Sequence, residues 1–69
     1  MRITINKGSD IRAERARRKI ARATFAKMSG INKYRLPAIE NDELEPTDEI
    51  KQKAETAFLQ FDQAQGSPA

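Results

Sequence analysis

The stretch from Arg22 to Leu44, RATFAKMSGINKYRLPAIENDEL, decides the fold of this 69-residue chain. It contains two short helical patterns, 22–28 and 32–40, on either side of Gly30. Gly30 suits the end of the first helix, because glycine adopts a positive φ without steric cost. Asn32 is a good N-cap for the second helix. The stretch therefore predicts two helices joined by a tight turn, a helix-turn-helix.

Apolar side chains recur through both halves of this stretch and would hold its two helices at one angle. They are Phe25, Ala26, Ile31, Leu36 and Ile39. That angle matters in a helix-turn-helix, because the second helix must protrude far enough to enter the major groove of DNA.

Two further helices are predicted outside the stretch. Ser9 would cap a helix that runs to about Ile20, with Asp10 in its first turn. Thr47 would cap a last helix whose apolar residues form one stripe, Ile50, Ala54, Ala57, Phe58 and Phe61. We therefore expect an all-α, compact four-helix domain over residues 10–62, followed by a flexible tail, 63–69, that has no apolar anchor.

Residues 1–9 form a separate N-terminal segment ahead of this domain. Ile3 and Ile5 alternate with Arg2 and Thr4, a pattern that suits a short β-strand. No second strand is apparent in the chain, so the strand would pair with its copy in a dimer. The alternative is a loose arm.

Charge is divided unequally along the chain. Residues 1–35 hold eleven basic residues against two acids, a net charge of +9, and residues 36–69 hold two against eight, a net charge of −6. A polyanion would therefore meet one face of the molecule. The cations of the first helix and its end would supply a general electrostatic field there: Arg12, Arg17, Arg18 and Lys19.

The composition excludes several kinds of chemistry. The chain has no Cys and no His, so disulfides, Cys/His zinc sites and His-based catalysis are absent. We expect no enzyme, no metal site and no cofactor. No apolar run approaches the length of a membrane span and no signal peptide is visible, which predicts a cytoplasmic protein.

Residues 11–58 resemble the Cro/C1-type (XRE-like) helix-turn-helix family, the fold of lambdoid phage repressors and Cro proteins. The matching residues are Ile11, Arg12, Arg15, Phe25, Ala26, Ser29, Gly30, Ile31, Leu36, Ile39, Glu40, Asn41, Pro46, Thr47, Ile50, Ala57 and Phe58. The resemblance implies a lambda-repressor-like bundle that binds a double-stranded DNA operator, usually as a homodimer. The function it implies is sequence-specific transcriptional regulation, with 32–40 as the recognition helix.

The same resemblance implies roles for individual residues. Arg22 would hold a phosphate, Lys33 and Tyr34 would read bases, and Ala38 would offer a methyl to thymine. The full set of expected DNA-contacting residues is Arg22, Asn32, Lys33, Tyr34, Arg35, Ala38 and Asn41. Arg15 and Glu40 would form a buried ion pair between the first and third helices.

Three features depart from the family pattern. Pro37 would be the fifth residue of a helix capped by Asn32, where proline costs about 3 kcal/mol. We therefore expect an opened or tightened turn at 33–35. Ala21 stands where the family caps the second helix with Ser or Thr. The fifth helix that often forms the dimer contact is missing, so residues 1–5 or the last helix would have to replace it.

Two other functions fit the sequence. One is an antitoxin, whose last helix or tail grips a protein partner while its helix-turn-helix autoregulates. The other is the DNA-binding head of a longer regulator. An exposed apolar patch on the last helix would favour a protein partner.

Overall fold

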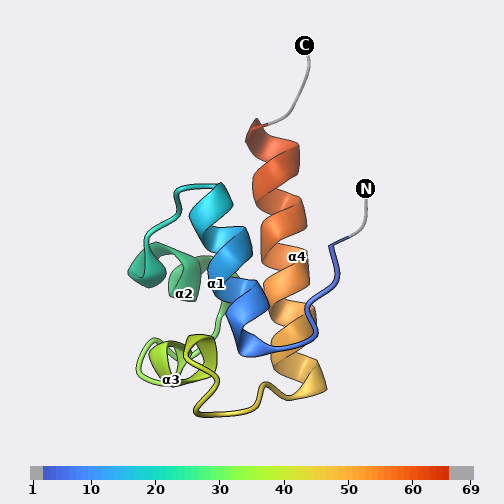
Figure 1. Ribbon diagram of the computed structural model, residues 1–69. Helices are drawn as coiled ribbons and strands as arrows, with labels where there is room; N and C mark the ends of the chain where they lie inside the picture. Colours follow the sequence, from blue (N-terminus) through green and yellow to red (C-terminus); the bar gives the residue numbers. More distant parts are fainter. Residues whose placement is uncertain (1–2, 66–69) are drawn as a thin grey trace.

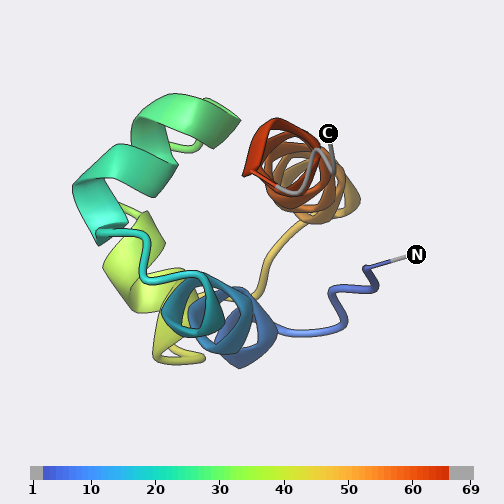
Figure 2. The ribbon, with the colours of Figure 1, turned by 90° about the horizontal axis from the view of Figure 1, so that it is seen from above.

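The computed structural model describes residues 3–65 and contains four α-helices in that range. They are α1 (Gly8–Arg17), α2 (Arg22–Ser29), α3 (Leu36–Glu40) and α4 (Asp48–Gln65). In Figure 1, α1 and α4 run in the same direction, and α4 extends beyond the other three helices. Seen from above, α1 and α4 are viewed nearly end-on, and α2 lies to one side of them, closer to the plane of the picture (Figure 2). The predicted all-α, four-helix fold is confirmed.

One apolar core joins the four helices. Phe25 of α2 stacks on Phe58 of α4 with ring centroids 4.5 Å apart, and neither ring is exposed. Both the predicted α2–α3 apolar residues and the inner residues of the α4 stripe are buried. The core residues are Ile5, Ile11, Ile20, Phe25, Ala26, Ile31, Leu36, Ile39, Ala54, Ala57 and Phe58. Burial of each large side chain stabilises the fold by about 1.5–3 kcal/mol.

The N-terminal segment is an extended arm, and the described part of the chain contains no strand. Ile5 is buried in the core, and its backbone N–H donates to the Glu55 carboxylate of α4 at 3.0 Å. Of the two alternatives, the described residues form an arm, and a helix side chain rather than a second strand accepts from its backbone. Strand pairing with a second copy of the chain stays a prediction. The arm passes along the lower half of α4 in Figure 1. Met1 and Arg2 lie outside the described residues.

The start of α1 differs from the prediction that Ser9 caps it. The helix begins at Gly8, and the Asp10 carboxylate accepts the backbone N–H groups of Asn6 (2.9 Å) and Lys7 (3.2 Å). A side chain at position 8 would overlap the backbone carbonyl of Ile39 in α3. Glycine is therefore required here, because α1 and α3 meet backbone to backbone.

Arg18 clamps the end of α1 to the C-terminal half of α4. Its Nε and Nη2 donate to the two carboxylate oxygens of Asp62, each at 2.7 Å, and its Nη1 donates to Glu14. The guanidinium also lies 4.8 Å from the ring centroid of Phe58. The expectation that Arg18 serves only a general electrostatic field is wrong, because its charge is used within the fold.

This clamp predicts a loss of stability in acid. The hydrogen bond from Arg18 lowers the pKa of Asp62 below the ordinary 3.8. The clamp is therefore fully present above about pH 4 and is lost as the pH falls through the lowered pKa. Since Asp62 is 45% exposed, we expect it to contribute at most about 1 kcal/mol. In urea unfolding, Asp62→Asn should be less stable than the parent at pH 7, and the difference should shrink as the pH falls below about 4. A difference that does not change with pH would contradict this assignment.

Candidate nucleic-acid interface

Hydrogen bonds of Gly30 and of the Ser29 side chain fix the turn between α2 and α3. Gly30 adopts φ +78°, and its N–H donates to the Ala26 carbonyl at 3.0 Å. The Ser29 hydroxyl donates to the carbonyl of Phe25 (2.8 Å) and accepts the N–H of Ile31 (3.2 Å). Burial of the Ile31 side chain in the core also fixes the direction in which the chain leaves this turn toward α3.

The second helix of the predicted helix-turn-helix is shorter than expected. It covers Leu36–Glu40 rather than 32–40, and residues 33–35 form a turn ahead of it. The Asn32 side chain accepts the N–H groups of Tyr34 (2.7 Å) and Arg35 (3.3 Å), so it caps this turn rather than a regular helix. The predicted rearrangement at 33–35 is therefore confirmed.

Pro37 explains where α3 begins. It is the second residue of the helix, not the fifth, and the first turn of a helix needs no N–H there. The expected cost of an interior proline does not arise, because α3 begins only at Leu36 and residues 33–35 form a turn of their own, in which the Arg35 and Leu36 N–H groups both donate to the Asn32 carbonyl. The turn at 33–35 is thus the conformation with which Pro37 is compatible.

The turn presents three exposed side chains, Lys33, Tyr34 and Arg35. Tyr34 is 81% exposed, and Lys33 Nζ lies 5.2 Å from the centroid of its ring. Within residues 3–65, neither Lys33 nor Arg35 forms an ion pair with a carboxylate. The sequence-predicted readers therefore share one exposed surface that carries unpaired positive charge.

The other predicted DNA-contacting residues differ in exposure. Asn32 is exposed, but its side-chain oxygen is engaged by the turn. Ala38 is only half-buried, so its methyl is partly accessible on α3. Asn41 is exposed at the C-terminal end of α3.

Glu40 joins two arginines on the inner side of this interface. Its fully buried carboxylate accepts Arg15 Nε and Nη2, each at 2.9 Å, and Arg22 Nε at 3.3 Å. Arg15 also donates to the Ile20 carbonyl at 2.9 Å. The Arg22 side chain is 45% exposed at the first position of α2, and no side chain caps that helix at Ala21. Arg22 is thus bonded to Glu40 through Nε, and nearly half of its side chain remains exposed.

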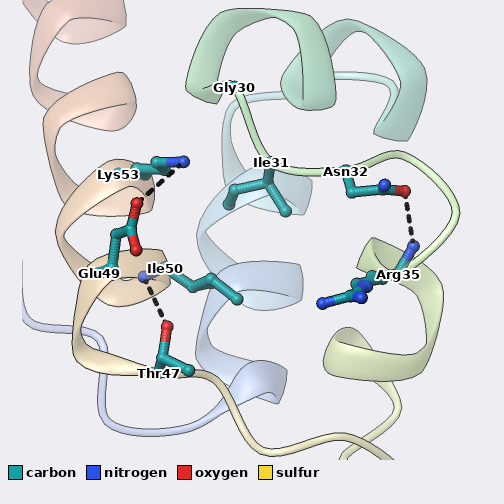
Figure 3. Close-up of a pocket in the computed structure, with 8 residues that line it drawn as sticks. All are labelled: Gly30, Ile31, Asn32, Arg35, Thr47, Glu49, Ile50 and Lys53. Atoms are coloured by element: carbon teal, nitrogen blue, oxygen red, sulfur yellow. Dashed lines mark hydrogen bonds and ion pairs between the residues drawn. The ribbon is translucent and has the colours of Figure 1, made fainter.

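A groove lies between the interface and α4. Figure 3 shows the Arg35 guanidinium turned from the 33–35 turn toward α4, below Ile31. The groove has a volume of about 320 Å³. It is lined by Gly30, Ile31, Asn32, Arg35, Thr47, Glu49, Ile50 and Lys53. Arg35 therefore belongs to the groove as well as to the exposed turn.

Sequence reasoning missed three parts of this region: the hydroxyl of Ser29 in the turn, the bond from Arg22 to Glu40, and the groove. Ser29 beside Gly30 was a visible turn signal, since Ser hydroxyls bond to nearby backbone. The other two depend on how distant segments pack, and no local pattern encodes them.

Comparison of the chain with protein-family models, curated proteins and solved structures found no match. Within the described residues, no cluster of His, Cys, Asp and Glu could hold a metal ion. Nor does any helix described here have the length and apolar character to cross a membrane.

Proposed function

We propose that this protein is a sequence-specific double-stranded DNA-binding regulator of transcription that acts like a small phage Cro protein or repressor. The observation that carries the proposal is the exposed turn of Lys33, Tyr34 and Arg35 on a rigid support. Tyr34 contributes nothing to the core, yet the turn holds it in the open beside a cation. Lys33 donates to guanine O6 or N7, and Tyr34 packs on a thymine methyl or bonds a phosphate.

Phosphate contacts would fix the position of this turn on the duplex. The uncapped first turn of α2 has free backbone N–H groups, and Arg22 adds a cation beside them. Asn41 lies exposed at the C-terminal end of α3, and its side-chain amide donates to a second phosphate. Such contacts release counterions, so binding weakens steeply as salt rises.

Residues 3–35 carry more positive than negative charge. Their two acids are Asp10, whose carboxylate accepts backbone N–H groups, and Glu14, which pairs with Arg17 and Arg18. The cations of this segment therefore outnumber its acids and attract a polyanion to it, whereas Asp42 and Glu43 lie exposed just after α3.

The antitoxin alternative needs either an apolar surface of α4 or the tail to grip a partner, and residues 66–69 of the tail lie outside the described residues. The inner residues of the α4 stripe are buried in the core, and Ile50 and Phe61 pack against it. The exposed large apolar residues in the described chain are Tyr34 and Leu44, and neither lies on α4. DNA binding is therefore the better supported function.

Selection of bound sites from random double-stranded DNA tests the proposal. We expect one enriched motif, and a palindrome with half-sites about 10 base pairs apart if a homodimer binds. Lys33→Ala should weaken binding about 10-fold to 100-fold and relax the motif at one position. Lys51→Ala, which removes the same charge from α4, should leave the motif unchanged. The absence of any enriched motif would reject the proposal.

Pro37→Ala should alter the sequence preference with little change in stability. Alanine at position 37 has an N–H that can bond the carbonyl of Lys33, so residues 33–35 can join a regular helix. That change re-aims Lys33 and Tyr34. The gained hydrogen bond stabilises the folded state, whereas the loss of proline makes the unfolded chain more flexible and so stabilises the unfolded state. Because the two effects oppose each other, the unfolding free energy should change by less than about 1 kcal/mol. An unchanged motif would show that the turn does not set base preference.

A further inference from the structure

The groove beside the turn has the composition of a binding site for a small organic anion. Ile31 forms one apolar wall and Ile50 of α4 faces it across the hollow (Figure 3). Its volume of about 320 Å³ falls at the lower end of the range for small-molecule sites. This volume is enough for an apolar body of roughly one aromatic ring.

The charges around the groove select the sign of the ligand. Arg35 points in from the turn, and Lys53 points in from α4 on the opposite side (Figure 3). Glu49 pairs with Lys53 at 3.4 Å, so one carboxylate stands against two cations. The Arg35 guanidinium forms no ion pair in the described residues and can bind a carboxylate through two parallel hydrogen bonds.

We propose that this groove binds a small carboxylate with an aromatic or branched aliphatic body. The body packs between Ile31 and Ile50, and the carboxylate is held by Arg35, with Lys53 adding charge from the far wall. Arg35 is exposed and Lys53 is half-buried with 41% of its side chain exposed, so the bound anion keeps part of its hydration and the cost of desolvating it is small.

Occupancy of the groove would regulate DNA binding, and this step rests on the proposed function. Arg35 belongs to both surfaces, so a carboxylate that holds it in the groove withdraws a cation from the DNA-facing turn. The coupling is reciprocal: DNA that recruits Arg35 must weaken carboxylate binding by the same factor.

Titration with phenylacetate, followed by ¹³C NMR of the isoleucine methyl groups, tests the site without DNA. We expect saturable shifts at Ile31 and Ile50 and a dissociation constant in the millimolar range, as for a ligand of this size in an open groove. Phenylacetamide has the same shape without the charge and should bind about tenfold more weakly. Equal binding of the two compounds, or no saturable shift at these methyls, would overturn the proposal.

Three variants locate the charge requirement. Arg35→Gln should weaken phenylacetate binding about tenfold, Lys53→Gln less strongly, and Lys51→Gln, a matched change on α4, not at all. Equal effects of all three would mean that the anion responds only to net charge. A separate titration with the selected DNA tests regulation: phenylacetate should weaken DNA binding by the parent and not by Arg35→Gln. If no DNA is bound at all, the proposed function fails while the methyl shifts still decide the site.

Discussion

Gly8→Ala should lower the free energy of unfolding by about 3 kcal/mol, the upper part of the range for overpacking a core. The added methyl would overlap the carbonyl of Ile39, which is backbone and cannot rotate away. The whole N-terminal end of α1 must then move from α3, which disturbs the buried Ile11 and Ile39. For a domain of this size the melting temperature should fall by about 15 °C, measurable by circular dichroism.

Gly30→Ala is the matched control, since it adds the same methyl at a glycine of the same chain. No atom lies within 4 Å of that methyl, but the residue has φ +78°, which alanine adopts at a cost of about 1–2 kcal/mol. Gly8→Ala should therefore be the more damaging of the two. A loss at position 8 no larger than at position 30 would mean that α1 and α3 do not meet backbone to backbone.

Much of the scaffold could be predicted from the sequence because its signals are local. The spacing of Phe25, Ile31 and Ile39 and the turn signal at Gly30 lie within one stretch, and the structure buries all three side chains around that turn. The α4 stripe is equally local, because its residues recur at helical spacing. Such patterns involve residues that are close together in the sequence, so they can be recognised without knowing which surface the helix packs against.

Features that depend on long-range contacts could not be predicted. In the sequence Gly8 resembles a helix breaker, but in the structure it begins α1. The backbone of α3 lies so close to it that a side chain would not fit at this position. Arg18 reads as a surface cation, yet Asp62, 44 positions along the chain, takes up its charge. The arm satisfies its backbone with Glu55, which no strand pattern reveals.

The candidate interface falls between these cases. Its candidate DNA-contacting residues were predicted from a resemblance, and the effect of Pro37 on the turn was predicted from the chemistry of proline. The direction of the Arg35 side chain could not be predicted, because it depends on the groove that α4 completes (Figure 3). A resemblance in sequence therefore does not predict the direction of each side chain.

Glu40→Gln should destabilise the protein by about 3–5 kcal/mol, the cost of breaking a buried ion pair by removing one partner. The Arg15 side chain is only 15% exposed, and it would keep two neutral acceptors, the Ile20 carbonyl and the glutamine side-chain oxygen, with no carboxylate beside its charge. The amide NH₂ of glutamine would also face an arginine N–H, donor against donor. Urea unfolding at neutral pH measures the loss, and in a domain this small it approaches the whole stability.

The double variant Arg15→Met, Glu40→Leu separates the stranded charge from the loss of the pair. If the stranded guanidinium causes the damage, removing both charges should recover most of the stability, because apolar side chains of similar size often replace a buried pair without loss. Arg22 is 45% exposed and can turn to water, so it leaves no buried charge behind. A double variant as unstable as Glu40→Gln would instead mean that the hydrogen-bond geometry of Glu40, linking α1, α2 and α3, is what the fold needs. If the double variant folds, it also tests the role of Arg22 on DNA. Arg22 would no longer be held by Glu40 but could still contact a phosphate. The DNA affinity of the double variant should therefore fall less than that of Arg22→Ala.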